Sequence, residues 1–131
     1  MAILDALGQH LEDVGIGTLG TSIFLSIMPD TPNVCVALYE DTGVGPVNLM
    51  GNNVVAIERP RIRAYVRAAR NEYVAARTMA ANVRDALGSL VATTIESVDI
   101  IAVEPTSDLY PITRDNDDRP IIACDFAGYV E

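Results

Sequence analysis

The stretch "IERPRIRAYVRAA" (residues 57–69) decides the fold of this chain, because its side chains alternate in character with a period of two. A period of two is typical of a β-strand, in which successive side chains point to opposite faces of a sheet. One face of the predicted strand is apolar and holds Ile62, Ala64 and Val66. The opposite face holds a row of basic and aromatic side chains, namely Arg61, Arg63, Tyr65 and Arg67. We therefore predict a strand with one face on the core and the other face outside it.

Helical and strand-like patterns continue on both sides of this stretch. Apolar residues recur at helical spacing over residues 71–88, which predicts the main helix, and again over residues 2–14, which predicts a first helix. Alternating or β-branched runs predict strands within residues 23–27, 33–40, 93–105 and 120–131. The main helix has an alanine-rich face, which would let it lie close to a sheet.

These elements predict one domain over residues 1–131, of the α+β class. We expect a mostly antiparallel sheet of four to five strands, with two helices packed on one face and a long loop between strands. We find no internal repeat and no boundary that would separate a second domain.

The size and composition fit a folded, acidic domain. The chain has 131 residues, of which 50% are hydrophobic, and its formal net charge is −9. A chain of this length can bury a substantial core. No apolar run approaches the ~20 residues that a membrane-spanning helix needs, so we expect no membrane partner. The N-terminal residues have no basic segment followed by a long apolar run, so we expect no signal peptide and a protein made in a cytoplasm.

The glycine-rich stretch "GIGTLG" (residues 15–20) matches the dinucleotide-binding pattern G-x-G-x-x-G, and Glu40 follows at a suitable distance. That pattern binds a pyrophosphate only where it follows a strand and opens a helix. Here a predicted helix comes before the glycines and a predicted strand comes after them. We therefore interpret the stretch as a connector and expect no nucleotide cofactor.

We find no group of residues that would make this chain an enzyme. His10 is the single histidine, so a zinc site would have to rely on carboxylates and only one side chain could act as an imidazole base. The acidic run at Asp115, Asp117 and Asp118 lacks the glycine and glutamate of a calcium loop. Cys35 and Cys124 sit in strand-like runs and are expected to be buried thiols. We predict no catalytic, cofactor-binding or metal-binding residues.

The segment "DTGVGPVNLMGNN" (residues 41–53) is predicted to be the long loop. It carries four large apolar side chains among its glycines, proline and asparagines: Val44, Val47, Leu49 and Met50. A loop of this length is usually functional or disordered. One interpretation is a segment that orders against a partner. The alternative is a loop folded over the protein's own core.

Charge is distributed unevenly along the chain. Residues 1–57 carry −6, residues 58–84 carry +5, and residues 85–131 carry −8. The basic middle includes the row Arg59, Arg61, Arg63, Tyr65 and Arg67. This row is either a solvated polar face or an interface, because arginine forms forked bonds to carboxylates at protein contacts. A basic surface and an acidic surface on one chain favour head-to-tail association, which closes into a ring where the rotation allows it.

Several stretches together resemble the minor capsid or tail terminator proteins of long-tailed bacteriophages. They are "MPDTPNVCVALYEDTG" (28–43), "IERPRIRAYVRAA" (57–69), "YVAARTMAANVRDAL" (73–87) and "LYPITRDNDDRP" (109–120). The resemblance covers residues 2 to 130. One departure is Asp118, which stands in the late turn where the pattern has a glycine.

The resemblance implies a structural virion protein of the tail or neck, assembled in the host cytoplasm. It implies a homo-oligomeric ring, typically a hexamer, that caps the tail tube, ends its polymerisation and joins the tail to the head connector. The implied partners are the tail tube protein and a head-completion or connector protein, and DNA passes through the lumen without specific binding. We expect the arginine row and the apolar residues of loop 41–53 to meet other subunits or proteins.

Two alternatives stay open on the sequence. The first is a head-completion or other neck protein, which would also form a ring. The second is a small acidic cytoplasmic enzyme or ligand-binding domain, which would be a monomer with a defined pocket.

Overall fold

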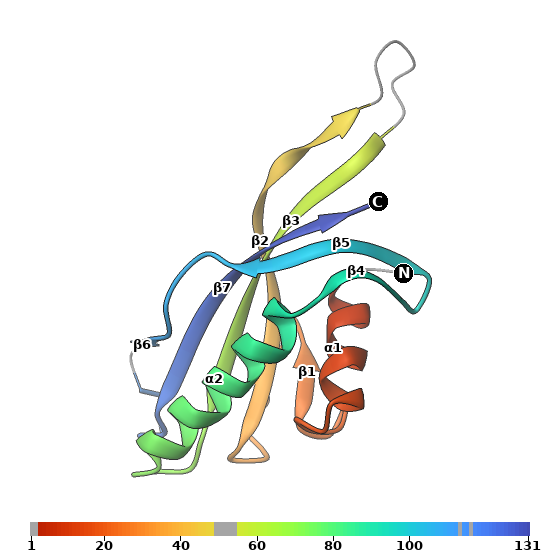
Figure 1. Cartoon of the computed structure of the whole chain (residues 1–131). Coiled ribbons are helices and arrows are strands. Elements are labelled where there is room, and N and C mark those ends of the chain that lie inside the picture. The colour runs from red at the N-terminus through yellow and green to blue at the C-terminus, as the bar shows by residue number, and fades with distance from the viewer. Residues whose placement is uncertain (1–2, 49–54, 113, 116) are drawn as a thin grey trace.

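Two helices and one sheet make up the computed structural model, which describes residues 3–48, 55–112, 114–115 and 117–131 (Figure 1). The helices are α1 (Ile3–Asp13) and α2 (Tyr73–Gly88). The strands are β1 (Ile23–Leu25), β2 (Cys35–Asn48), β3 (Val55–Arg67), β4 (Val91–Ile95), β5 (Val98–Pro105), β6 (Tyr110–Ile112) and β7 (Ile121–Val130). The α+β class is therefore as predicted.

The sheet differs from the prediction in size and in strand direction. Its strand order is β1-β2-β3-β7-β5-β4, and β6 pairs with β7 beside this path. The pair β1–β2 is parallel, whereas the other pairs are antiparallel. The predicted mostly antiparallel sheet of four to five strands was wrong, because the described chain forms a mixed sheet of seven strands. The strand predicted within residues 23–27 is β1, whereas the region predicted as strand over 93–105 contains two strands, β4 and β5, and β6 was not predicted and spans only three residues. Runs this short carry almost no periodic signal in sequence.

The stretch that we used to predict the fold is the centre of this sheet. Strand β3 lies between β2 and β7, and its apolar side chains are buried: Ile62, Ala64 and Val66 are each no more than 2% exposed. Their partners across the sheet, such as Leu38 of β2 and Ile122 of β7, are also fully buried. The alternation of this strand therefore does separate a core face from an outer face.

The helices lie on the core face, and the sheet curls around them (Figure 1). Helix α2 buries Ala76, Ala80, Val83 and Leu87, and it packs on β3, β5 and β7. Helix α1 buries Leu7 and Leu11 completely and packs near β1, β2 and α2. The two helices are also joined through His10, whose Nε2 lies 3.1 Å from the carbonyl oxygen of Ala86. The small side chains of α2 allow its close approach to the sheet.

Most of the predicted loop 41–53 forms a strand: residues 41–48 belong to β2, which pairs with β3. Strand β2 runs on to Asn48, and its register with β3 pairs Val44 with Arg59, Val47 with Ile57 and Asn48 with Val55. The register shifts between these pairs, which shows that the glycines and the proline are absorbed as bulges. Over residues 41–48 the predicted long loop is therefore corrected to a bulged extension of β2. Leu49 and Met50, which belong to the same prediction, lie outside the described residues.

Strands β4 and β5 form a tight hairpin that begins two residues before the predicted strand region 93–105 and ends with it. Glu96 and Ser97 turn the chain with φ of 50° and 66°. Two successive residues with positive φ are typical of a two-residue hairpin turn that matches the twist of its strands.

Candidate interaction surfaces

The outer face of the sheet carries the predicted arginine row, and the structure divides that row into members with different roles. Arg67 is only 3% exposed although it carries a charge. Its guanidinium donates to the carbonyl oxygens of Pro29 (2.7 Å), Pro32 (2.6 Å) and Asn33 (3.2 Å). Arg67 therefore holds the connection between β1 and β2 from inside the subunit.

A second buried arginine, which the sequence did not point to, lies beside Arg67. Arg119 is 4% exposed, and its guanidinium contacts the carboxylates of Asp30 (2.8 Å), Asp115 (2.8 Å) and Asp117 (3.2 Å). It also donates to the carbonyl oxygen of Asp30 at 2.7 Å. The contacts join the β1–β2 connection to the segment before β7. We call Asp30, Arg67, Asp115 and Arg119 the loop latch.

Hydrogen bonds to Asp115 set the charge state of the latch. Burial of Asp115 disfavours its charged form, but the backbone N–H and the guanidinium of Arg119 both donate to this carboxylate and outweigh the burial. The net result is a lowered pKa of Asp115. Asp115 therefore stays ionised, and paired with Arg119, at acidic pH values at which an ordinary aspartate would begin to be protonated.

Arg63 stands at the centre of the outer face and is also paired within the subunit. Its Nε donates to Asp125 at 2.7 Å, and its Nη2 lies 3.3 Å from Asp41. The hydroxyl of Tyr110 donates to the same Asp125 at 3.2 Å. The hydrogen bond with Asp125, followed by one with Tyr65, raises the pKa of the Arg63 guanidinium above its usual value. This cross-strand network joins β2, β3, β7 and β6.

Aromatic side chains accompany this network. The rings of Tyr39 and Tyr65 pack edge to face, with centroids 5.3 Å apart and an interplanar angle of 79°. Such a pair adds a directional contact to the area that it buries. Tyr65, a member of the predicted row, is thus engaged by its neighbour on β2.

Arg59 and Arg61 lie where β3 leaves the body of the sheet. Both line a small hollow together with Ala127, Gly128 and Tyr129 of β7. Arg61 makes no ion pair within the described part of the chain. Arg61 therefore lies on the outer face with a positive charge that is not paired with a carboxylate of the described residues.

Beyond these arginines the β2–β3 pair continues away from the sheet. We call this extension the arm, and it comprises residues 42–48 and 55–57. Strand β7 pairs with β3 from Glu58 onward, so within the described residues the arm is a ribbon of two strands (Figure 1). The structure places Val44 and Val47 of the predicted partner-binding segment in this arm.

The other candidate groups have structural roles in the described chain. The glycine-rich segment follows helix α1 and leads into β1, so no helix begins at its glycines. Cys35 and Cys124 are free thiols that are buried, as predicted, and burial raises the pKa of both.

Over the residues that the structure describes, no three His, Cys, Asp or Glu side chains gather as a metal-binding group. None of the described helices is long and apolar enough to span a membrane.

Comparison with known proteins defines the class of this protein. A family model described as "Bacteriophage tail terminator protein" matches residues 10–127. A chain in a solved structure described as "Virion of native gene transfer agent (GTA) particle" superposes with a TM-score of 0.74 at 21% identity, covering 99% of this chain and 95% of that chain. A second solved chain superposes with a TM-score of 0.60 at 15% identity, covering 98% of this chain and 93% of its own. No curated protein sequence matches.

The fold and its exposed surfaces, taken with these matches, define a structural component of a phage virion. The chain belongs to the bacteriophage tail terminator family, whose model covers most of its length. Its place is therefore the tail or neck of the virion, as the sequence resemblance implied.

Proposed function

We propose that the protein closes into a ring of six copies that caps the tail tube, ends its polymerisation and joins the tail to the head connector. Membership of the tail terminator family supports the position at the tail end. The observation that carries the proposal is the arm, which leaves the body of the sheet as a ribbon of two strands. The ring acts by binding and has no catalytic role.

The arm has a physical reason to find a neighbour. A ribbon of two strands is at best marginally stable in water, and its edges offer unpaired backbone groups that other chains can bind. We propose that the arm contacts the neighbouring subunit or the next tail or head protein. Val44 and Val47 are its proposed contact residues, and Leu49 and Met50, which lie outside the described residues, stay predicted contact residues.

The arginine row contributes to these contacts in two ways. Arg61, which makes no ion pair with the described residues, stands at the base of the arm and is proposed to reach a neighbouring chain directly, and Arg59 is proposed to border the same contact. Arg63, Tyr65 and Arg67 act through the subunit, since their partners lie within it. These three residues support assembly by fixing the conformation of the outer face and of the β1–β2 connection.

The acidic character of the chain suits a channel for DNA. The formal net charge of −9 gives a ring of such subunits a strongly negative field. Phosphates are repelled by such a surface, so DNA would slide through the lumen without adhering to it.

Tail assembly with and without the protein tests this function. Purified tail tube protein is allowed to polymerise and the tubes are measured by electron microscopy. We expect tubes of unlimited length alone and capped tubes of defined length with the protein. A protein that neither binds tube ends nor limits their growth would contradict the terminator role.

A shortened-arm variant tests the arm separately. Residues 45–58 are replaced by a two-residue Asn-Gly turn, which joins the register pair Val44 and Arg59 in a hairpin between β2 and β3. We expect a subunit that folds, as shown by a single cooperative thermal unfolding transition, but that no longer caps tubes. A shortened variant that caps tubes as well as the parent protein would refute the role of the arm.

A further inference from the structure

Two exposed surfaces of the subunit are not used by the arm or by the arginine row. One is a ridge on helix α2, and the other is a hollow on the β4–β5 hairpin. We infer that the ridge of one copy docks into the hollow of the next copy, as the side-to-side contact of the ring. This inference rests on the proposed ring and names the surfaces that close it.

The α2 ridge consists of exposed and half-exposed side chains of the helix, namely Val74, Arg77 and Thr78, which border a shallow depression between α2 and Leu109. Val74 is 77% exposed, which is unusual for a large apolar side chain, and its neighbour Tyr73 is 40% exposed. Arg77 makes no ion pair with any described residue of its own chain. The ridge therefore presents an apolar side chain beside a positive charge that its own subunit does not offset.

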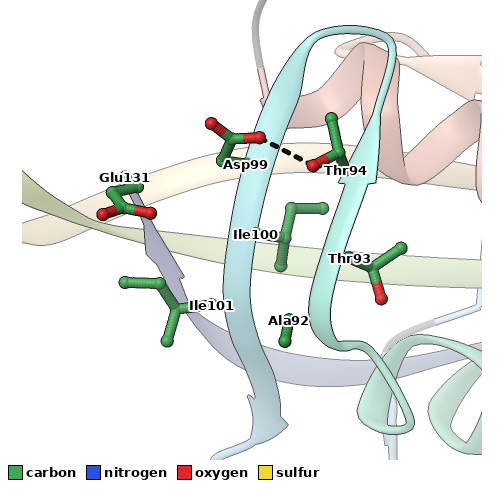
Figure 2. Close-up of a pocket in the computed structure, with 7 residues that line it drawn as sticks. All are labelled: Ala92, Thr93, Thr94, Asp99, Ile100, Ile101 and Glu131. Atoms are coloured by element: carbon green, nitrogen blue, oxygen red, sulfur yellow. Dashed lines mark hydrogen bonds between the residues drawn. The ribbon is translucent and has the colours of Figure 1, made fainter.

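The β4–β5 hollow is a shallow depression of about 390 Å³ at the edge of the sheet (Figure 2). Its outer side chains are Ala92, Thr94, Asp99, Ile101 and Glu131. Asp99 and Glu131 lie side by side, since the backbone N–H of Glu131 donates to the carbonyl oxygen of Asp99 at 2.9 Å. Asp99 also accepts a hydrogen bond of 2.7 Å from the hydroxyl of Thr94. Ile101 is 38% exposed, so the hollow combines an apolar patch with two carboxylates.

The backbone of β4 favours docking by side chains over the addition of another strand. Strand β4 ends the sheet, but Ala92 has a φ of 47°, which interrupts the regular edge. The carbonyl oxygen of Val91 already accepts a hydrogen bond from the hydroxyl of Thr93. A kinked, partly satisfied edge is a poor template for β-pairing. Contact through side chains such as Val74 and Arg77 suits this edge better than the addition of an extended strand does.

Charge complementarity identifies the occupant as a second copy of this chain. Copies with a net charge of −9 repel one another in general, so a stable contact needs a local positive group facing a local negative one. Arg77 supplies the positive group and the Asp99–Glu131 pair supplies the negative one. Arginine matches this role because its planar guanidinium binds carboxylates in forked geometry. Val74 and Ile101 would then meet at the apolar centre of the contact.

The positions of the two surfaces suit a closed ring. Helix α2 begins at one side of the molecule, and the β4–β5 turn lies at the opposite side (Figure 1). A contact between two different surfaces of identical subunits is heterologous, and such contacts form rings when the rotation closes. The same pair of surfaces therefore repeats at every junction.

Disulfide trapping tests the contact directly. The double variant Val74→Cys/Ile101→Cys is oxidised with copper phenanthroline on capped tail tubes, and the products are separated without reductant. We expect a ladder of covalent oligomers that ends at the closed ring. Cys35 and Cys124 do not compete, because both are buried. The single variants Val74→Cys and Ile101→Cys are the matched controls, and head-to-tail geometry predicts no ladder from either.

The outcomes separate the contact from the ring itself. Rings that are visible by electron microscopy but give no ladder would overturn this contact and leave the ring proposal standing. Tubes without any ring would overturn the ring proposal.

A charge exchange provides a second readout that does not depend on cysteine. Arg77→Glu and Asp99→Arg should each reduce ring formation at least ten-fold, and the combination of both on one chain should restore most of it. Arg70→Glu is the control, because Arg70 lies outside the ridge and is 71% exposed. Absence of restoration in the combined variant, with both single variants folded, would contradict the inference.

Discussion

The Nη2 atom of Arg119 lies 2.8 Å from Oδ1 of Asp30, and this contact joins residues that are 89 positions apart in the sequence. Together with the bonds of Arg67, it fixes the connection between β1 and β2 against the segment that leads into β7. The end of the subunit opposite the arm is thus held by buried charge as well as by apolar packing. This arrangement gives the loop latch measurable consequences.

Removal of Arg119 should destabilise the subunit strongly. Arg119→Ala leaves the Asp115 carboxylate without its partner in a partly buried site, and breaking such a pair costs about 3 kcal/mol. We expect the free energy of unfolding in urea to fall by that amount. The control is Arg114→Ala, since the Arg114–Asp118 pair is half exposed and should contribute less than about 0.5 kcal/mol. Equal effects of the two substitutions would refute the latch.

Acid should weaken the latch through Asp115. The pKa of Asp115 is lower in the folded protein than its ordinary value, so its stabilisation is fully present above the unfolded pKa of about 3.9 and is lost as the pH falls through the lower folded pKa. The stability difference between the parent and Asp115→Asn should therefore be constant between about pH 7 and about pH 5 and should shrink below about pH 4. Urea unfolding across this range measures it. A difference that grows toward acid pH would have the wrong sign.

Replacement of Arg67 by lysine should loosen the β1–β2 connection without unfolding the protein. The Arg67 guanidinium bonds three carbonyl oxygens in different directions, and an ammonium group cannot reproduce that geometry. We expect faster amide hydrogen exchange over residues 26–34 in Arg67→Lys and little change elsewhere. Arg61→Lys is the matched control on the same strand, and it should leave exchange in that segment unaltered.

The two thiols should be inert in the folded subunit. Cys35 is fully buried, Cys124 is 2% exposed, and burial raises the pKa of both, so little thiolate forms near neutral pH. An aromatic disulfide reagent should label them only after denaturant is added. Rapid labelling of either thiol in buffer would show that the core around β2 or β7 opens readily.

Local periodicity was sufficient to predict the main elements. Alternation identified β3 with its buried face, and helical spacing over residues 71–88 identified α2 to within two residues. The segment 41–53 misled the prediction because glycine and proline normally end strands, whereas here bulges in β2 accommodate them. The parallel direction of the β1–β2 pair was not predicted. It depends on the conformation of the β1–β2 connection, which Arg67 and Arg119 fix from distant positions in the sequence.

The interaction surfaces were predictable only in outline. The sequence indicated a basic middle and acidic ends, but it could not show that Arg63 and Arg67 are bound by their own subunit. Arg119 went unnoticed because it stands in an acidic turn, and only the fold brings Asp30 to it.

The mass of the protein when it caps a tail tube tests the central claim most directly. The assembly is released from purified capped tubes under mild conditions and weighed by native mass spectrometry. Six copies of a 14.1 kDa subunit give about 85 kDa, and class averages of the same sample should show closed cyclic symmetry. Release of monomers or open oligomers of mixed size from tubes that are properly capped would contradict the ring.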